Sequence, residues 1–261
     1  MNSNVAPCSY IVNLRSSNGN ARIVALVLLS IEGGYRLGQF RRSRSDSEQD
    51  APVGAMVGST LGLLAFMLAF TFGMAASRFD TRKALVLDEA NAIGTTFLRA
   101  GMLPEGRDEV RGLLRDYVDV RLAAVGASDI TAALRQTEDL QNQLWARAVA
   151  AGLQHPNSIV VGLYVETLNE VIDLHAKRVT AGLRNRIPGA IWVSLFGIAA
   201  LSLGAMGYHS GLAGTARSLA VVAVALVFSA VIALIVDLDR PQEGSLMVSQ
   251  QPLIDVRQTM K

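Results

Sequence analysis

Four stretches of apolar residues stand out along the chain, each close to the length that a membrane-crossing helix needs. They are Ile23–Phe40, Val57–Ala76, Ile187–Tyr208 and Ser218–Val236. Between the second and third stretches, apolar residues recur at steps of three and four among polar ones, as in amphipathic helices. This pattern predicts an all-α integral membrane protein with four transmembrane helices and a helical bundle between the second and third of them.

The second stretch continues without a break into the polar region. No proline or glycine lies between Met74 and Ile93, so nothing forces the helix to end at the membrane surface. Beyond the membrane, one face stays apolar through Val86, Ala90, Ile93 and Phe97. We predict one helix over Val57–Phe97, which at ~1.5 Å per residue reaches about 60 Å.

Two stripes distinguish the membrane half of this helix. One holds small residues, which let helix backbones approach closely in lipid: Gly58, Gly62, Ala65, Ala69, Gly73 and Ala76. The other is bulky in its middle and polar at its ends: Ser59, Leu63, Phe66, Phe70, Met74 and Ser77. If several copies surround an axis, Phe66 and Phe70 form an apolar constriction that gates a pore. Alternatively, both rings simply pack against neighbouring helices, and periodicity alone leaves both possibilities open.

The polar region predicts three further helices joined by short turns, a pattern typical of a bundle. They cover about Glu105–Ala124, Asp129–Ala151 and Ser158–Asn185, and Pro252 marks the start of a short terminal helix. The predicted divisions are a disordered N-terminus (1–20), transmembrane helices 1 and 2 (21–76), a cytosolic helical domain (77–186), transmembrane helices 3 and 4 (187–238) and a C-terminal tail (239–261).

Charge sets the expected orientation. Four spans put both termini and the helical domain on one side, and basic residues near the membrane are more numerous on that side. The positive-inside rule therefore predicts that this side is the cytoplasm. Arg41, Arg42 and Arg44 lie on the opposite side and argue against this orientation.

Composition excludes several classes of function. The mean hydropathy of +0.33 and the block arrangement point to the lipid bilayer as a partner. The 24 basic and 22 acidic residues nearly balance, so no nucleic acid is expected. The single cysteine, Cys8, excludes a disulfide framework within the chain. No catalytic or phosphate-binding motif appears, so we expect neither an enzyme nor a cofactor.

Carboxylates and histidines offer no metal site. Glu166, Glu170 and His175 share a predicted helix but lack the Glu-x-x-His spacing of di-iron bundles. We interpret the two glutamates as a solvated face and His175 as a core or interface histidine. Asp237 and Asp239 lack the frame of a calcium loop, which favours capping or interface roles.

A charged pair interrupts the first span. Glu32 and Arg36 lie four residues apart and can pair on one helix face. A charge within a span is a functional-site hypothesis. The alternative is that Arg36 reaches the membrane interface and neutralises Glu32.

Two motifs carry a family resemblance. Residues 68–82, LAFTFGMAASRFDTR, followed by Glu89-Ala-Asn-Ala-Ile93, resemble the second transmembrane helix of bestrophins. The plan of two spans, a helical region, two spans and a tail is similar too. More closely, the chain resembles a bacterial group termed bestrophin-like, which shares these motifs and the exit from Asp237 to Pro241. That likeness covers nearly all of residues 20–258 and implies the bacterial inner (plasma) membrane.

The resemblance implies a pore. Bestrophins are pentameric ion channels, anion-selective in animals and cation-permeable in some bacterial members, with an apolar neck on the second transmembrane helix. Alignment on Arg78-Phe79 places Phe66 and Phe70 at two neck positions. Gly62 falls at a third, where bestrophins carry a bulky residue, so the neck is expected to be shorter or wider here. Their acidic calcium clasp has no match in this chain beyond two aspartates.

Together these observations predict a homo-pentameric, bestrophin-like channel for small inorganic ions. Its pore-lining residues are Gly62, Phe66 and Phe70, and its helix-packing residues are Gly58, Ala65, Ala69 and Gly73. The alternative is a membrane-anchored helical sensor or scaffold without transport activity.

Overall fold

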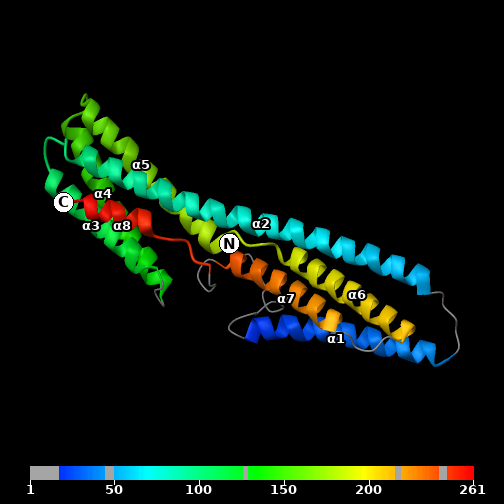
Figure 1. The fold of residues 1–261 in the computed structure, drawn as a ribbon. Coiled ribbons are helices and arrows are strands. Elements are labelled where there is room, and N and C mark those ends of the chain that lie inside the picture. Colours follow the sequence, from blue (N-terminus) through cyan, green and yellow to red (C-terminus); the bar gives the residue numbers. More distant parts are fainter. Residues whose placement is uncertain (1–17, 45–49, 126–128, 215–218, 241–245) are drawn as a thin grey trace, which may run out of the picture. The chain divides into compact units, whose positions relative to one another are not determined.

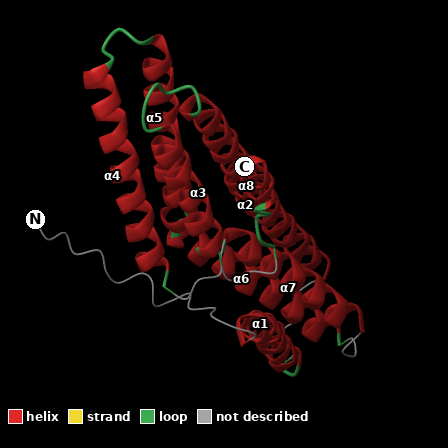
Figure 2. Cartoon of the chain, turned by 90° about the vertical axis from the view of Figure 1, so that its left-hand side faces the viewer, coloured by secondary structure: helices red, strands yellow, loops and turns green. Residues whose placement is uncertain are grey.

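The structure is a computed structural model of the 261-residue chain. It describes residues 18–44, 50–125, 129–214, 219–240 and 246–261. Within these ranges every regular element is a helix and none is a strand (Figure 2). The predicted all-α class is therefore confirmed.

Eight α-helices and one π-helical turn follow one another through the described ranges (Figure 1). They are α1 (Asn18–Arg42), α2 (Asp50–Ala100), α3 (Arg107–Ala123), α4 (Ile130–Gln154), α5 (Ile159–Val179), η1 (Thr180–Arg184), α6 (Gly189–Ala213), α7 (Leu219–Asp239) and α8 (Gln251–Thr259). The helix predicted over Val57–Phe97 is confirmed as part of the 51-residue α2. The prediction of a disordered N-terminus falls on residues 1–17, outside the described ones, and on residues 18–20, where α1 has already begun.

Within the described ranges, four helical runs are long and apolar enough to cross a membrane: Ala21–Arg42, Pro52–Ala100, Ile159–Ala213 and Val221–Asp239. The second run is free of charge only up to Ser77, and the third is free of charge only beyond Arg186. We therefore restrict the membrane-spanning segments to α1, the first half of α2, α6 and α7.

The chain divides into two compact units. The first unit comprises residues 1–77 and 186–240 and holds the membrane-spanning segments. The second unit comprises residues 78–185 and 241–261 and is an amphipathic helical bundle. The division near Ser77 and Arg186 lies close to the boundaries drawn from the sequence.

In the first unit, α1 and α6 pack backbone against backbone through glycines. A Cβ atom added to Gly34 would lie 1.9 Å from the carbonyl oxygen of Gly204, and one added to Gly207 would lie 2.1 Å from that of Ile31. Gly38 and Gly211 are enclosed in the same way. Small residues permit this approach in lipid, where close packing drives helix association. Glycines such as Gly34 lower the hydropathy of the first span, and the same glycines allow α1 to pack closely against α6.

Asp239, the last residue of α7, links this helix to the segment before α6. Its Oδ1 accepts a hydrogen bond of 3.0 Å from the backbone N–H of Ile187, just before α6. The carboxylate is buried, and the bond ties the end of α7 to the approach to α6. Of the two roles that the sequence favours, capping or interface, this contact fits the interface role, because Ile187 precedes the N-cap of α6.

In the second unit, apolar faces of α2, α3, α4 and α5 form one core. Its fully buried members include Ile93, Leu114, Leu144 and Leu168. Two of the helix starts are capped by side chains that accept a hydrogen bond from a backbone N–H, namely Asp129 at α4 and Ser158 at α5. These contacts confirm the predicted bundle.

The C-terminal helix belongs to this bundle. Leu253 of α8 is completely buried in the core. Arg257 donates to both carboxylate oxygens of Asp119 on α3, at 2.7 and 2.9 Å. Arg115 donates from Nε to the carbonyl oxygen of Met260 at 3.0 Å. The residues that the sequence leaves as a tail therefore contribute to the second unit from Leu246 onward.

Candidate functional site

The predicted pore-lining residues lie on an uncovered face of α2. The Phe66 side chain is 66% exposed and that of Phe70 is 56% exposed, and Gly62 is exposed as well. The opposite face is covered, since Leu64 and Leu68 are buried. Within the described chain, then, the two phenylalanines do not serve as internal packing residues.

The predicted helix-packing stripe is uncovered too. Gly58, Ala65, Ala69 and Gly73 are all exposed. A Cβ atom added to Gly58, Gly62 or Gly73 would meet no described atom within 4 Å. Close glycine packing inside the chain occurs between α1 and α6 instead. The role of the stripe in packing neighbouring subunits stays a prediction.

Glu32 and Arg36 form the pair that their spacing predicts. Arg36 donates from Nε to Glu32 Oε1 at 2.8 Å. The Arg36 side chain is largely exposed and that of Glu32 is half-buried. The geometry fits neutralisation of Glu32 within one helix face, and a functional role for this glutamate stays untested.

The most deeply buried charged side chain among the described residues is that of Glu89, in the second unit. This residue of α2 is 0% exposed. Its Oε1 accepts a hydrogen bond from the Tyr117 hydroxyl at 3.0 Å. Arg121 donates to both of its oxygens, from Nε at 3.2 Å and from Nη2 at 3.4 Å.

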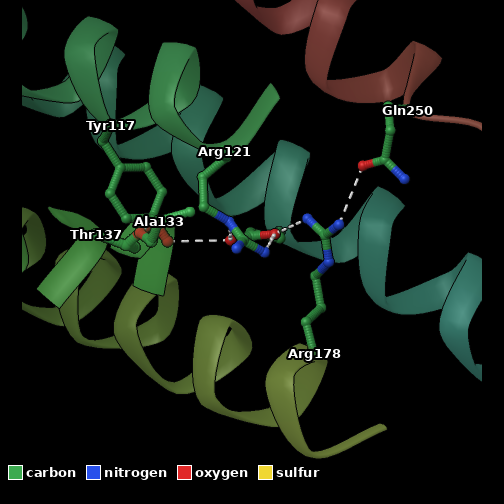
Figure 3. A network of polar contacts seen from close by, with 7 residues as sticks. Tyr117, Arg121, Ala133, Thr137, Arg178 and Gln250 are labelled. Carbon is green, nitrogen blue, oxygen red and sulfur yellow. Dashed lines mark hydrogen bonds and ion pairs between the residues drawn. The ribbon is translucent and has the colours of Figure 1, made fainter. Parts of the chain in front are cut away.

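A second guanidinium completes the cluster. Arg178 of α5 donates from Nη1 to Glu89 Oε2, and from Nη2 to the side-chain oxygen of Gln250 at 3.0 Å. Figure 3 shows Arg121 from α3 and Arg178 from α5 reaching toward the same point, with Gln250 beyond Arg178. We call Glu89, Tyr117, Arg121 and Arg178 the Glu89 cluster. It joins α2, α3 and α5 by charge-assisted hydrogen bonds, which are stronger than neutral ones.

The cluster keeps its carboxylate ionised. Burial by itself would raise the pKa of Glu89, but the charges of Arg121 and Arg178 outweigh it and hold that pKa below its usual value. Burial, together with the nearby Glu89 charge, raises the pKa of Tyr117 far above its usual value. The phenol therefore remains a hydrogen-bond donor at all physiological pH values.

His175 borders the cluster as an uncharged ring. It is buried, and its ring meets that of Tyr117 edge to face with centroids 6.4 Å apart. Burial, with the charge of Arg121, lowers the pKa of His175 to about 4. The interpretation of this residue as a core histidine is confirmed.

A cavity of about 370 Å³ lies beside the cluster, entirely within the second unit. Arg82, Arg121, Arg178 and Gln250 supply its polar lining. Apolar residues of α2, α4 and η1 supply much of the rest. The size falls within the range of pockets that hold small molecules.

The sequence analysis singled out none of these polar residues as a site, although a signal was present. Glu89 lies on the same helix face as Val86 and Ile93, at steps of three and four. Arg121 continues the buried face of α3 four residues after Tyr117. A charged residue in a buried stripe requires a partner, and two such stripes with opposite charges indicate an ion pair between the helices.

The acidic residues on α5 face solvent. Glu166, Glu170 and Asp173 are exposed, which confirms the predicted solvated face. Across the described ranges, no group of three or more His, Cys, Asp or Glu residues is arranged to hold a metal ion. The polar site of the second unit is thus the Glu89 cluster, in which two guanidinium groups surround one carboxylate.

Comparison with known proteins places the chain in a family. The family model for the bestrophin-like domain matches residues 24–253. The chain belongs to the bestrophin-like family. The match covers both units, including the Glu89 cluster and the exposed face of α2. No curated protein and no solved structure matches this bestrophin-like chain.

Proposed function

We propose that this bestrophin-like protein is an oligomeric ion channel whose neck is formed by α2. The observation that carries the proposal is the uncovered face of α2, where Phe66 and Phe70 lie one helical turn apart and exposed. In a pore of several copies, the two rings form stacked apolar collars. Apolar collars of this kind gate a pore by excluding water.

The neighbouring stripe of α2 supports assembly around an axis. Gly58, Ala65, Ala69 and Gly73 present a smooth, uncovered surface along the same helix. Such surfaces allow close contact between helices in lipid. In the proposed oligomer this stripe packs against the α2 helix of the next subunit. By analogy with the bestrophins that the chain resembles, we propose five subunits and small inorganic ions as the transported species.

The ends of the neck face are polar. Ser59 lies toward one end and Ser77 toward the other, and both are exposed. Gly62 widens the neck one turn before Phe66. An apolar ring does not itself prefer one sign of charge, so the proposed neck controls whether ions pass rather than which ions pass. We place the second unit in the cytoplasm, following the distribution of basic residues. The bacterial inner membrane is proposed from the resemblance to the bestrophin-like bacterial group.

Ion flux through reconstituted liposomes tests the proposal. Phe70→Ala removes one collar, so it should raise the flux without changing the subunit count. Phe72→Ala is the matched control, because Phe72 is an exposed phenylalanine of the same helix on a different face. Equal flux for wild type and a correctly assembled Phe70→Ala variant would contradict the neck. No flux from any variant would favour a membrane-anchored sensor or scaffold instead.

A further inference from the structure

The cavity beside the Glu89 cluster combines two kinds of wall. Its polar side is made by Arg82, Arg121, Arg178 and Gln250. Its apolar side is made by Leu85, Val86, Val125, Ile130, Leu134, Leu183 and Val248. All of these residues belong to the second unit, so the cavity does not depend on the membrane-spanning segments.

Among the described residues that line the cavity, positive charge exceeds negative charge at the polar wall. Arg121 and Arg178 both pair with Glu89, which supplies a single carboxylate to two guanidinium groups. Arg178 also donates to Gln250, whose side-chain amide carries no charge. A buried cation without a full counter-charge is costly. The wall is therefore suited to a further negative group.

The positions of the two arginines are fixed before any ligand arrives. Arg121 is held by two hydrogen bonds to Glu89, and Arg178 is held between Glu89 and Gln250. Guanidinium groups match carboxylate and phosphate geometry. Because the arginines are already positioned, a bound anion would not have to order two long side chains.

The apolar wall is shaped by the π-helical turn. η1 interrupts the regular spacing at the end of α5 and brings Ala181, Gly182 and Leu183 to the cavity. At Gly182 a Cβ atom would meet no described atom within 4 Å, so the space beside this glycine is open.

We propose that this cavity binds a small amphiphilic anion, a carboxylate with a short apolar chain. The head group lies against Arg121 and Arg178, and the chain lies against Leu85, Ile130 and Leu134. The proposal rests on the second unit alone and does not require that the protein conducts ions. A charged head group alone or an apolar chain alone is not sufficient for tight binding, because the cavity presents both a polar and an apolar wall.

Three probes separate the two contributions. Hexanoate carries both the charge and the chain, hexanamide carries the chain with an uncharged head, and acetate carries the charge alone. Equilibrium dialysis of each labelled probe against full-length protein in nanodiscs, with empty discs subtracted, measures binding. We expect saturable binding of hexanoate and at least about tenfold weaker binding of the other two, because hexanamide loses the charge-assisted hydrogen bonds and acetate loses the buried apolar chain.

Two variants locate the bound hexanoate. Arg178→Gln should weaken binding at least about tenfold, whereas Arg184→Gln, an exposed arginine of η1 outside the lining, should not change it. Gly182→Leu should abolish binding by filling the open space while leaving every charge in place. Gly162→Leu is its control, an exposed glycine of α5 with equally open surroundings.

The outcomes are decisive in either direction. Saturable hexanoate binding that is lost in Gly182→Leu and kept in Gly162→Leu supports the site, even if Arg178→Gln fails to fold. Equal binding of hexanoate and hexanamide would overturn it, because the arginines would then recognise nothing. If acetate bound as tightly as hexanoate, the proposed contact between the ligand's chain and the apolar wall would be wrong. No binding above that of empty discs would overturn the whole proposal. Channel activity enters none of these readouts, so the neck and the cavity are tested separately.

Discussion

Glu89 and Arg178 form an ion pair between helices, and the two residues are 89 positions apart in the chain. The pair ties the bundle half of α2 to the end of α5, and Arg121 ties the same carboxylate to α3. Three helices of the second unit thus converge on one buried negative charge. Removing one member of a buried ion pair is strongly destabilising, because the partner stays buried without compensation.

Glu89→Gln should therefore destabilise the second unit. It leaves Arg121 and Arg178 buried without their counter-ion, a change that costs about 3–5 kcal/mol. For a chain of this size, that corresponds to a fall in Tm of about 10 °C. Asp88→Asn removes a carboxylate from the adjacent, exposed position and should leave Tm within about 2 °C of the wild-type value. Thermal unfolding in detergent measures both, and equal Tm values would contradict the structural role of Glu89.

Gly207→Ala should separate α1 from α6. The added methyl group would lie 2.1 Å from the carbonyl oxygen of Ile31, and backbone cannot yield as a side chain can. We expect a loss of most folded, monodisperse protein on size-exclusion chromatography. Gly197→Ala, on the same helix with nothing within 4 Å, should behave like wild type. If both alanine variants purify equally well, the backbone contact between these helices is wrong.

His175 should make the protein less stable in acid. Its folded pKa of about 4 lies below the unfolded value near 6.5, so between these pH values the unfolded chain binds more protons. Stability from this group is complete above pH ~6.5 and is lost as the pH falls toward ~4. The loss is of the order of 1–3 kcal/mol. His175 faces Arg121, Arg178 and Glu89, whose charges contribute to the shift.

The difference between two histidine variants isolates this effect. His175→Gln should flatten the dependence of Tm on pH between about 6.5 and 4. His155→Gln, at the C-cap of α4, should retain the wild-type dependence. A wild-type slope in His175→Gln would show that other groups cause the acid sensitivity.

The C-terminal helix should contribute to the stability of the second unit. Leu253→Ala removes a completely buried side chain and should cost about 2–5 kcal/mol. Ile254→Ala changes the next residue, which is exposed, and should cost much less. Thermal unfolding of the two variants compares them directly. Equal stabilities would mean that α8 does not pack against the core in solution.

The spacing of apolar residues along the chain was sufficient to predict most of the fold. The apolar blocks and the three-and-four spacing predicted the spans, the long α2 helix and the bundle, because burial of one helix face leaves a direct mark on the sequence. The packing of α1 on α6 could not be predicted, since Gly34 and Gly207 weaken apolar stretches and reveal their partners only in three dimensions.

The polar site was harder to predict for a different reason. Glu89 and Arg121 lie in buried stripes, which indicates that each needs a partner, but which residues pair depends on how α2, α3 and α5 approach one another. The position of α8 likewise depends on a few contacts, such as Arg257 with Asp119, that leave no periodic signal in so short a segment. The two stripes of α2 were predicted from the sequence, and both are largely uncovered in the described chain; their packing against a second copy of α2 stays a prediction.

The subunit count of the purified full-length protein tests the proposed channel most directly. Native mass spectrometry in mild detergent gives this count without assuming any transported ion. We predict five copies, which would bring the faces that carry Phe66 and Phe70 around one axis. A stable monomer or dimer would leave no axial pore and would contradict the channel.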